Sequence, residues 1–474
     1  MTCKIHVSSM TMYMSPIPLS VGTIIKREAV KIHEVYAQNV EKCPVDDRKV
    51  MTNGLSSILD LCDQSLNSQQ RLFNSKQWHK LLEQFSFLKL QPSCLSKQVF
   101  DTICIVKNCC QSEGDMTSTL AYTKALKDQA ERAEDVLSYK IVKYSLKLLR
   151  DYPLMLIKNP PIDYTESDYL YVLWMKIFKT MFPPEKSLVR IKTGESIFST
   201  STASKKELYP DAKDIRGFKI DIRFTVDIDR KEIDVAVAKV AKDDNKDKTI
   251  SDQGKLSREG KDIIDNLVDI VDVKTIKSCR AYLFQIAGSE CIVSSISLGS
   301  NGLYVVLHQN DISLPCSPQE LDNLSSFLPL LSSYKREIES LALEVKSKSS
   351  QKFGTRKVLG LEQTKKVWEC IHWVRDTYYS PPPKSISAIP CSLFGSPPPN
   401  ILSKLKSAYE KDTGRAYRQE EEEEEQDNPS EYEVYGWKGK TMESSIISLA
   451  KQLLMNIPQR EMKRESKKLP ELPF

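Results

Sequence analysis

The sequence lacks the short motifs that mark several well-known enzyme classes. It contains no glycine-rich phosphate-binding loop, no serine nucleophile elbow and no His-Glu-x-x-His pattern. It also lacks any run of 18 apolar residues, so we expect no transmembrane helix and no membrane partner. The enzyme classes that carry those motifs therefore have no direct support in the sequence.

The 12 cysteines show no spacing typical of a metal site. None belongs to a Cys-x-x-Cys pair that is matched by a second pair or by two histidines, so no zinc is expected. We expect no secretory signal, because Pro16 and Pro18 interrupt the methionine-rich stretch near the N-terminus. Reduced thiols then predict an intracellular protein, of the nucleus or the cytoplasm.

The charge balance gives no strong indication of a nucleic-acid partner. Lys and Arg number 68 while Asp and Glu number 63, so the net charge is +5. At so weak a net charge, only a local basic patch would argue for phosphate contacts. The length of 474 residues suggests two or three domains, at about 150 residues per domain.

The clearest strand pattern lies within residues 216–288. Apolar side chains alternate from Phe218 to Phe224, which predicts a strand with one face in a core. Residues 233–240 are almost continuously apolar, so the next strand should be buried on both faces. The polar residues 227–231 between them favour a turn. We therefore predict an antiparallel hairpin.

Helical and strand patterns continue after this hairpin. Apolar residues recur at helical spacing from Leu256 to Val271, and residues 282–288 read as a further strand. A second hairpin is predicted across the turn-rich residues 299–302. The predicted order is strand, turn, strand, helix, strand and hairpin.

A helix and a short strand are predicted before the hairpin. Thr165 is a favourable N-cap residue, and Asp168 stands three positions later to complement the exposed amides. The apolar face of this helix extends to Phe182, and the next two residues are prolines that should end it. Residues 187–195 then read as a short strand.

The composition divides the chain into four segments. We expect a poorly ordered segment at 1–50, a helical region at 51–152 and an α+β core with following helices at 160–346. Residues 351–474 contain two proline triplets, six consecutive glutamates and a basic tail, so we expect low order there. That C-terminal region suits binding to protein partners.

The element order over residues 160–345 resembles the core of the PD-(D/E)XK nuclease-like superfamily, an α+β fold with an α/β-like centre. Several short sequence motifs resemble those of expanded families of uncharacterised fungal proteins that carry a degenerate version of this core. The shared phrases are Glu166-Ser-Asp-Tyr, Lys192-Thr-Gly-Glu195, Gly217-Phe-Lys-Ile-Asp221, the strand end at Lys242, Lys255-Leu-x-x-x-Gly-Lys261 and Gln285-Ile-Ala-Gly288.

The resemblance implies a site for metal-dependent phosphodiester cleavage. Asp221 matches the acid of the family's central strand, and Glu166 stands where the family often has an acid in the first helix. If the site is active, these acids hold Mg²⁺ and Lys242 steers the attacking water. If the site is inactive, no cofactor is expected. The basic residues Lys255, Arg258 and Lys261 would contact phosphates.

One position departs from the family pattern. The second strand should carry an acid where this sequence has Lys239, and a cation there opposes a metal ion. We therefore expect Lys239 to face Asp221 across neighbouring strands. The resulting prediction is a catalytically inactive nuclease-like protein, with nucleic-acid contact as a retained function. Two alternatives stay open: an interaction or scaffold protein without a nucleic-acid role, and an active Mg²⁺-dependent nuclease that uses Asp221.

Overall fold

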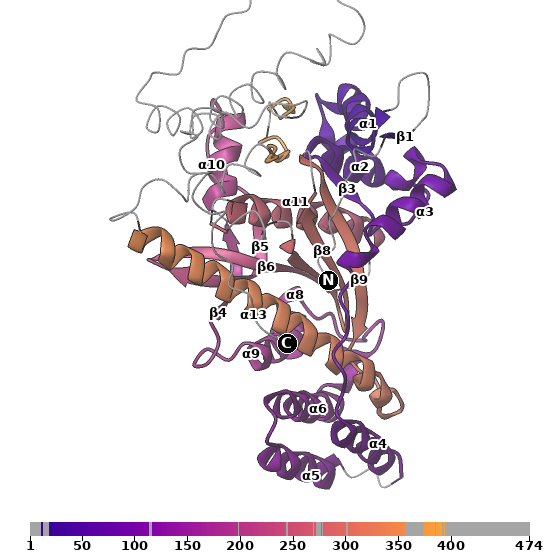
Figure 1. Cartoon of the computed structure of the whole chain (residues 1–474). Coiled ribbons are helices and arrows are strands. Elements are labelled where there is room, and N and C mark those ends of the chain that lie inside the picture. The colour runs from indigo at the N-terminus through magenta and orange to yellow at the C-terminus, as the bar shows by residue number, and fades with distance from the viewer. Residues whose placement is uncertain are drawn as a thin grey trace, which may run out of the picture. The chain divides into compact units, whose positions relative to one another are not determined.

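The chain divides into two units after Leu393, and every residue described below belongs to the first unit. In this computed structural model the described residues are 11–12, 19–112, 116–197, 199–242, 245–268, 270–271, 276, 278–299, 302–355, 373–383, 385–390 and 393 (Figure 1).

A mixed sheet of seven strands lies at the centre of the unit, in the order β3-β9-β8-β7-β6-β5-β4 (Figure 1). The pairs β6–β7 and β3–β9 are parallel, and the other neighbours are antiparallel. The strands are β3 (Ile58–Asp60), β4 (Val189–Ile197), β5 (Lys219–Ile228), β6 (Lys231–Ala241), β7 (Ala281–Ala287), β8 (Glu290–Leu298) and β9 (Tyr304–Ser313).

Along the chain, helices stand before, between and after the strands, so the described part of the chain is a mixed α+β structure. The longer helices are α1 (Val21–Tyr36), α2 (Val45–Leu55), α3 (Ser75–Gln84), α4 (Lys97–Ser112), α5 (Met116–Gln129), α6 (Ala133–Asp151), α10 (Ser199–Leu208), α11 (Lys246–Val268) and α13 (Leu324–Thr355). The short elements are β1 (Thr11–Met12), β2 (Leu19–Ser20), α7 (Pro153–Leu156), α8 (Glu166–Asp168), the π-helix η4 (Tyr169–Trp174), α9 (Met175–Met181) and the 3₁₀ turns η1 (Val40–Lys42), η2 (Gln69–Leu72), η3 (Ser86–Leu88) and η6 (Pro318–Asn323). No helix of the described residues is long and apolar enough to cross a membrane.

The predicted central hairpin is confirmed. β5 and β6 pair antiparallel, with Ile222 opposite Ala238. Asp229 and Arg230 connect them with positive φ angles of 48° and 65°, the left-handed conformation that suits a tight two-residue hairpin. The predicted helix also packs on this sheet, as α11. It begins at Lys246, ten residues before Leu256, where the predicted apolar spacing starts. The second predicted hairpin is present as β8 and β9.

One face of the sheet is aromatic. The ring of Phe224 lies 5.2 Å from that of Phe178 in α9 and 5.7 Å from that of Phe284 in β7. Tyr334 of α13 packs at 5.8 Å from Phe284. The Phe178–Phe224 and Phe284–Tyr334 pairs meet edge to face, which adds specific geometry to the burial of large rings. Helices α9 and α13 thus cover this face.

Helix α11 covers the opposite face, and it lies unusually close to the strands. A Cβ atom at Gly260 would stand 2.6 Å from Leu283 and 2.7 Å from Ile296. Only glycine leaves room for the helix at this distance. The glycine of the phrase Lys255-Leu-x-x-x-Gly-Lys261 therefore has a packing role.

For residues 19–50, the structure corrects the expectation of poor order at 1–50. Residues 21–36 and 45–55 form α1 and α2, and the predicted boundary at residue 51 falls inside α2. Buried Ile25, Leu59 and Val305 share one apolar cluster, which joins these helices to the sheet edge. The expectation failed because this segment buries its apolar side chains against residues more than 200 positions later. Of the helical region predicted at 51–152, residues 75–151 are mainly helical, but residues 58–60 form the strand β3 where a helix was expected.

The structure also corrects the start of the low-order region. Among residues 373–390, the side chains of Val374, Tyr378 and Tyr379 are buried in the first unit. These aromatic and apolar residues outweigh the effect of the neighbouring prolines. The glutamate run and the basic tail lie outside the described residues.

Gly260→Ala should destabilise the protein by about 1–3 kcal/mol, because the new methyl group overlaps Leu283 and Ile296. Gly254→Ala is the matched control on the same helix. Its methyl group would meet Lys49 Cγ at 3.4 Å, an ordinary contact, so the gain in helix propensity of up to about 1 kcal/mol should dominate. Urea unfolding of both variants measures the difference. Equal stability of the two would contradict the close packing at Gly260.

Candidate functional site

Asp221 and Lys239 face one another across β5 and β6, as the sequence predicts. Lys239 Nζ lies 3.3 Å from Asp221 Oδ1, and the backbone amide of Val240 donates to Asp221 Oδ2 at 2.9 Å. Both oxygens of the carboxylate are thus engaged. Lys239 is 12% exposed in its side chain, so its ammonium is largely removed from water.

Glu259 of α11 lies close to this pair and was not identified from the sequence. It is 2% exposed, and neither carboxyl oxygen has a hydrogen-bond partner among the described residues. Burial raises the pKa of Glu259 to about 8, although the charge of Lys239 acts in the opposite direction. Burial alone would lower the pKa of Lys239, but the charges of Glu259 and Asp221 outweigh it and raise that pKa.

The remaining residues of the implied catalytic set are engaged elsewhere. Glu166 forms an ion pair with Lys248, and Lys242 Nζ lies 3.0 Å from Asp163 Oδ1. The predicted N-cap is present, since Thr165 Oγ1 accepts from the Asp168 amide and Asp168 accepts from the Thr165 amide. Neither Glu166 nor Lys242 bonds to Asp221.

The donor set does not fit a magnesium ion. Mg²⁺ requires several oxygen ligands in near-octahedral geometry. Here an ammonium occupies one oxygen of Asp221 and an amide occupies the other. Across the described residues, no three Asp, Glu, His or Cys side chains are grouped so that they could hold a metal ion.

Two of the three predicted phosphate contacts are corrected by the structure. Arg258 is 4% exposed and Lys261 is 0% exposed. Arg258 donates to the Tyr378 carbonyl at 3.0 Å, and Lys261 donates to the Arg375 carbonyl. Lys255 alone is exposed, and its Nζ lies 3.1 Å from Asp252 Oδ1. From the sequence, the spacing of these charges predicts a helix face exposed to water. In the structure, residues 375–378 cover that face at Arg258 and Lys261.

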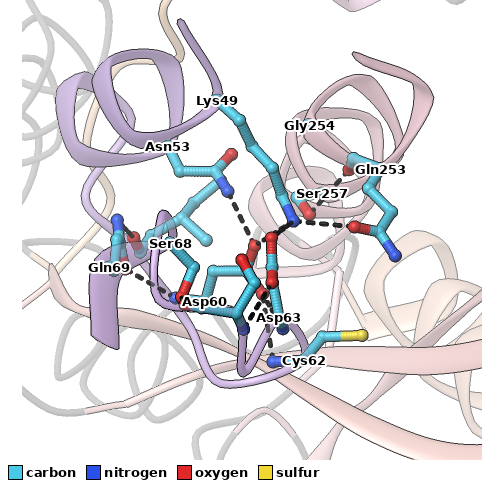
Figure 2. Close-up of polar contacts among 12 residues, drawn as sticks. Lys49, Asn53, Asp60, Cys62, Asp63, Ser68, Gln69, Gln253, Gly254 and Ser257 are labelled. Atoms are coloured by element: carbon cyan, nitrogen blue, oxygen red, sulfur yellow. Dashed lines mark hydrogen bonds and ion pairs between the residues drawn. The ribbon is translucent and has the colours of Figure 1, made fainter. Parts of the chain in front are cut away.

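A second charged cluster, formed by Lys49, Asp60, Asp63 and Gln253, joins α2 to α11 (Figure 2). Lys49 Nζ lies 3.0 Å from Asp60 Oδ2, 2.9 Å from Asp63 Oδ2 and 2.7 Å from Gln253 Oε1. Lys49 and Asp60 are 5% and 3% exposed. A buried ammonium with three oxygen partners is well compensated.

The protein backbone fixes the carboxylates of this cluster. Asp60 ends β3, and its Oδ1 accepts from the amides of Cys62 and Asp63 at 3.0 and 3.3 Å. Asn53 of α2 donates to Asp60 Oδ2 at 3.2 Å. Burial alone would lower the pKa of Lys49, but Asp60 and Asp63 raise it well above its ordinary value. The cluster therefore holds a permanent positive charge on Lys49 at neutral pH.

A small cavity of about 10 Å³ adjoins the Lys49 cluster. Asp60, Cys62, Gln253, Ser257 and Gln285 contribute to its polar lining. Gln285 Nε2 donates to the Thr249 carbonyl at 2.7 Å, but no described residue bonds to its Oε1. The volume matches a single water molecule with polar neighbours.

No local sequence signal identifies the Lys49 cluster. Lys49 belongs to a polar run that reads as exposed, and Gln253 stands 204 residues later. Scans of the chain against protein-family models, curated proteins and solved structures found no match.

Glu259→Gln should change how stability depends on pH. Between about pH 4.5 and 8 the folded chain holds a proton on Glu259 that the unfolded chain has lost. This carboxyl group therefore makes stability fall as pH rises through that window, by up to about 1.4 kcal/mol per unit. The variant removes the effect, so it should gain stability over the wild type as pH rises. Thermal unfolding at pH 5, 6.5 and 8 tests this.

The control is Glu131→Gln, at an exposed position, which should shift stability equally at all three pH values. A constant difference between Glu259→Gln and the wild type would show that Glu259 is ionised in the folded protein.

Lys49→Met should cost about 3–5 kcal/mol, because it leaves the buried Asp60 and the partly buried Asp63 without their cation. Adding Asp60→Asn and Asp63→Asn should recover part of the loss, since the uncompensated charge is then removed. Denaturant unfolding of the single and triple variants measures the coupling. Strictly additive costs would mean that the three side chains act independently.

Proposed function

We propose that this protein is a catalytically inactive nuclease-like protein. The proposal rests on the pairing of Asp221 with Lys239. These are the two positions at which an active member of the superfamily that this chain resembles needs acids. At about 4 Å and an effective dielectric near 20, such a pair attracts by roughly 4 kcal/mol before desolvation. The lysine supplies the positive charge that a metal ion would otherwise supply.

The order of elements supports the same proposal. Helical segment 166–181 precedes β4, β5 and β6, which are successive antiparallel neighbours. Helix α11 then crosses to β7, which is parallel to β6. Apart from α10, which stands between β4 and β5, this order follows the helix, three strands, helix and strand sequence on which the resemblance depends.

Burial of Arg258 and Lys261 weakens a retained nucleic-acid role, because a phosphate cannot reach them while residues 375–378 cover them. The same observation favours the second candidate function, an interaction or scaffold protein. The residues that cover α11 contact it through side-chain and backbone groups typical of peptide recognition.

The purified protein should not cleave DNA or RNA in the presence of Mg²⁺ or Mn²⁺, because Lys239 prevents a metal ion from binding at Asp221. A time course with single- and double-stranded substrates measures this, with Asp221→Ala as the control for contaminating nucleases. Robust cleavage that is lost in Asp221→Ala would overturn the inactive assignment and establish a metal-dependent nuclease.

Lys239→Glu should raise affinity for Mg²⁺, because it replaces the competing ammonium with a second carboxylate beside Asp221 and Glu259. Isothermal titration with Mg²⁺ and Mn²⁺ compares it with Lys239→Met, which removes the cation without adding a ligand. If neither variant binds the metal better than the wild type, the Asp221 region is not a lost metal site.

A further inference from the structure

Residues 373–383 and 385–390, here called the strap, lie between α1 and α10 and over α11 (Figure 1). The strap forms neither helix nor strand in its described positions. It joins α1 through the Ser387 amide, which donates to the Ala37 carbonyl at 3.0 Å. Its contacts with α11 are therefore the side-chain and backbone contacts of an irregular peptide on a helix face.

A single carboxylate of α11 recognises two hydroxyl groups of the strap. Thr377 donates to Asp262 Oδ1, and Tyr379 donates to Asp262 Oδ2 at 2.9 Å. In an extended segment, residues two apart point to the same side, so both hydroxyls reach one acceptor. Asp262 is 6% exposed, and burial raises its pKa to about 6. The pattern that fits this carboxylate is a Thr-x-Tyr sequence.

The surface that contacts the strap is here called the groove; it includes Arg258, Lys261 and Asp262 of α11, together with Tyr209 and Phe218. Three donors of the groove bind main-chain carbonyl groups of the strap. Arg258 Nη1 donates to the Tyr378 carbonyl and Tyr209 Oη donates to the Tyr379 carbonyl, each at 3.0 Å. Lys261 Nζ donates to the Arg375 carbonyl. Such contacts hold a backbone whatever its side chains, and they add affinity without sequence selectivity.

The two neighbouring tyrosines occupy different surroundings. The Tyr379 ring packs on Phe218 with centroids 5.1 Å apart. The Tyr378 ring lies 5.9 Å from the Arg258 guanidinium, and its hydroxyl lies 2.7 Å from Ser387 Oγ. Ser387 Oγ in turn lies 3.0 Å from His33 Nε2 of α1. The ring of the middle residue of Thr-Tyr-Tyr therefore contacts α11, while its hydroxyl bonds to Ser387 of the strap itself.

The charges of the groove favour a peptide over a phosphate chain. Asp262 and Asp265 stand on the same helix as Arg258 and Lys261, and Lys261 Nζ lies 2.6 Å from Asp265 Oδ2. Two carboxylates beside two cations leave little net attraction for a polyanion. A peptide, by contrast, supplies hydroxyl donors for the carboxylates and carbonyl acceptors for the cations.

We propose that this groove is a peptide-recognition site, occupied by the chain's own strap and able to take the strap of a second copy. The fit shown for Thr377–Tyr379 identifies the occupant, because a second copy carries the same segment. The 17 residues at 356–372 join α13 to the strap, and they can span up to about 60 Å, enough to reach a neighbouring molecule. This proposal deepens the interaction function proposed above.

An exchange experiment tests the groove in the full-length chain. A protease site is placed within residues 356–372, the protein is cleaved, and a fluorescent peptide of residues 373–390 is added. The labelled peptide should bind saturably and displace the cleaved segment. Peptides with Thr377→Val or Tyr379→Phe should each bind about tenfold or more weakly, because each loses a hydrogen bond to a buried carboxylate.

A peptide with Ile386→Ala is the control, since that side chain is 59% exposed and should not affect binding. All substitutions are in the peptide, so folding of the protein is unchanged. A cleaved segment that exchanges only when the whole protein unfolds would overturn the proposal, and so would equal binding of all peptides.

The second-copy occupant has its own measurement. Light scattering of the uncleaved chain should show a dimer at high concentration, and excess peptide should dissociate it. Peptide exchange after cleavage, together with a strictly monomeric uncleaved chain, would overturn the second-copy occupant. The nuclease time course is independent of these results, so cleavage by the Asp221 site and failure of strap exchange remain distinguishable.

Discussion

Charged side chains that leave water need partners elsewhere in the protein, and helix α11 meets this constraint in three directions. Toward the sheet it places Glu259 near the Asp221–Lys239 pair. Toward α2 it offers Gln253 to Lys49. Toward the strap it offers Arg258, Lys261 and Asp262. Segments from both ends of the first unit are therefore tied to one helix.

This arrangement bears on the proposed function in two ways. Two of the three residues expected to contact phosphates, Arg258 and Lys261, lie inside the protein, so their charges serve cohesion between segments. The position expected to hold a metal ion carries a covalently attached cation instead. In both places a charged group has its partner within the chain itself, which supports the interaction function proposed above more than turnover of a substrate.

Local patterns were enough to predict β5, β6 and the N-cap at Thr165, because strand alternation and capping depend on residues a few positions apart. The Asp221–Lys239 contact was also predictable, since a tight hairpin places these strands side by side. The burial of Arg258 was not, because its carbonyl partner at Tyr378 stands 120 residues later. The helical spacing of charges looks the same whether water or a peptide covers them. Glu259 escaped notice for a similar reason: a glutamate in a polar helix reads as solvated.

The contact of α1 with the strap can form only late in the synthesis of the chain. His33 and Ser387 are 354 residues apart. At a synthesis rate of about 5–20 residues per second, α1 leaves the ribosome roughly 20–70 s before its partner exists. The apolar cluster that contains Ile25 is also incomplete for most of that interval, until Val305 and Leu307 of β9 have been made. Chaperones that shield short apolar helices therefore have a long window in which to act on the first residues of this chain.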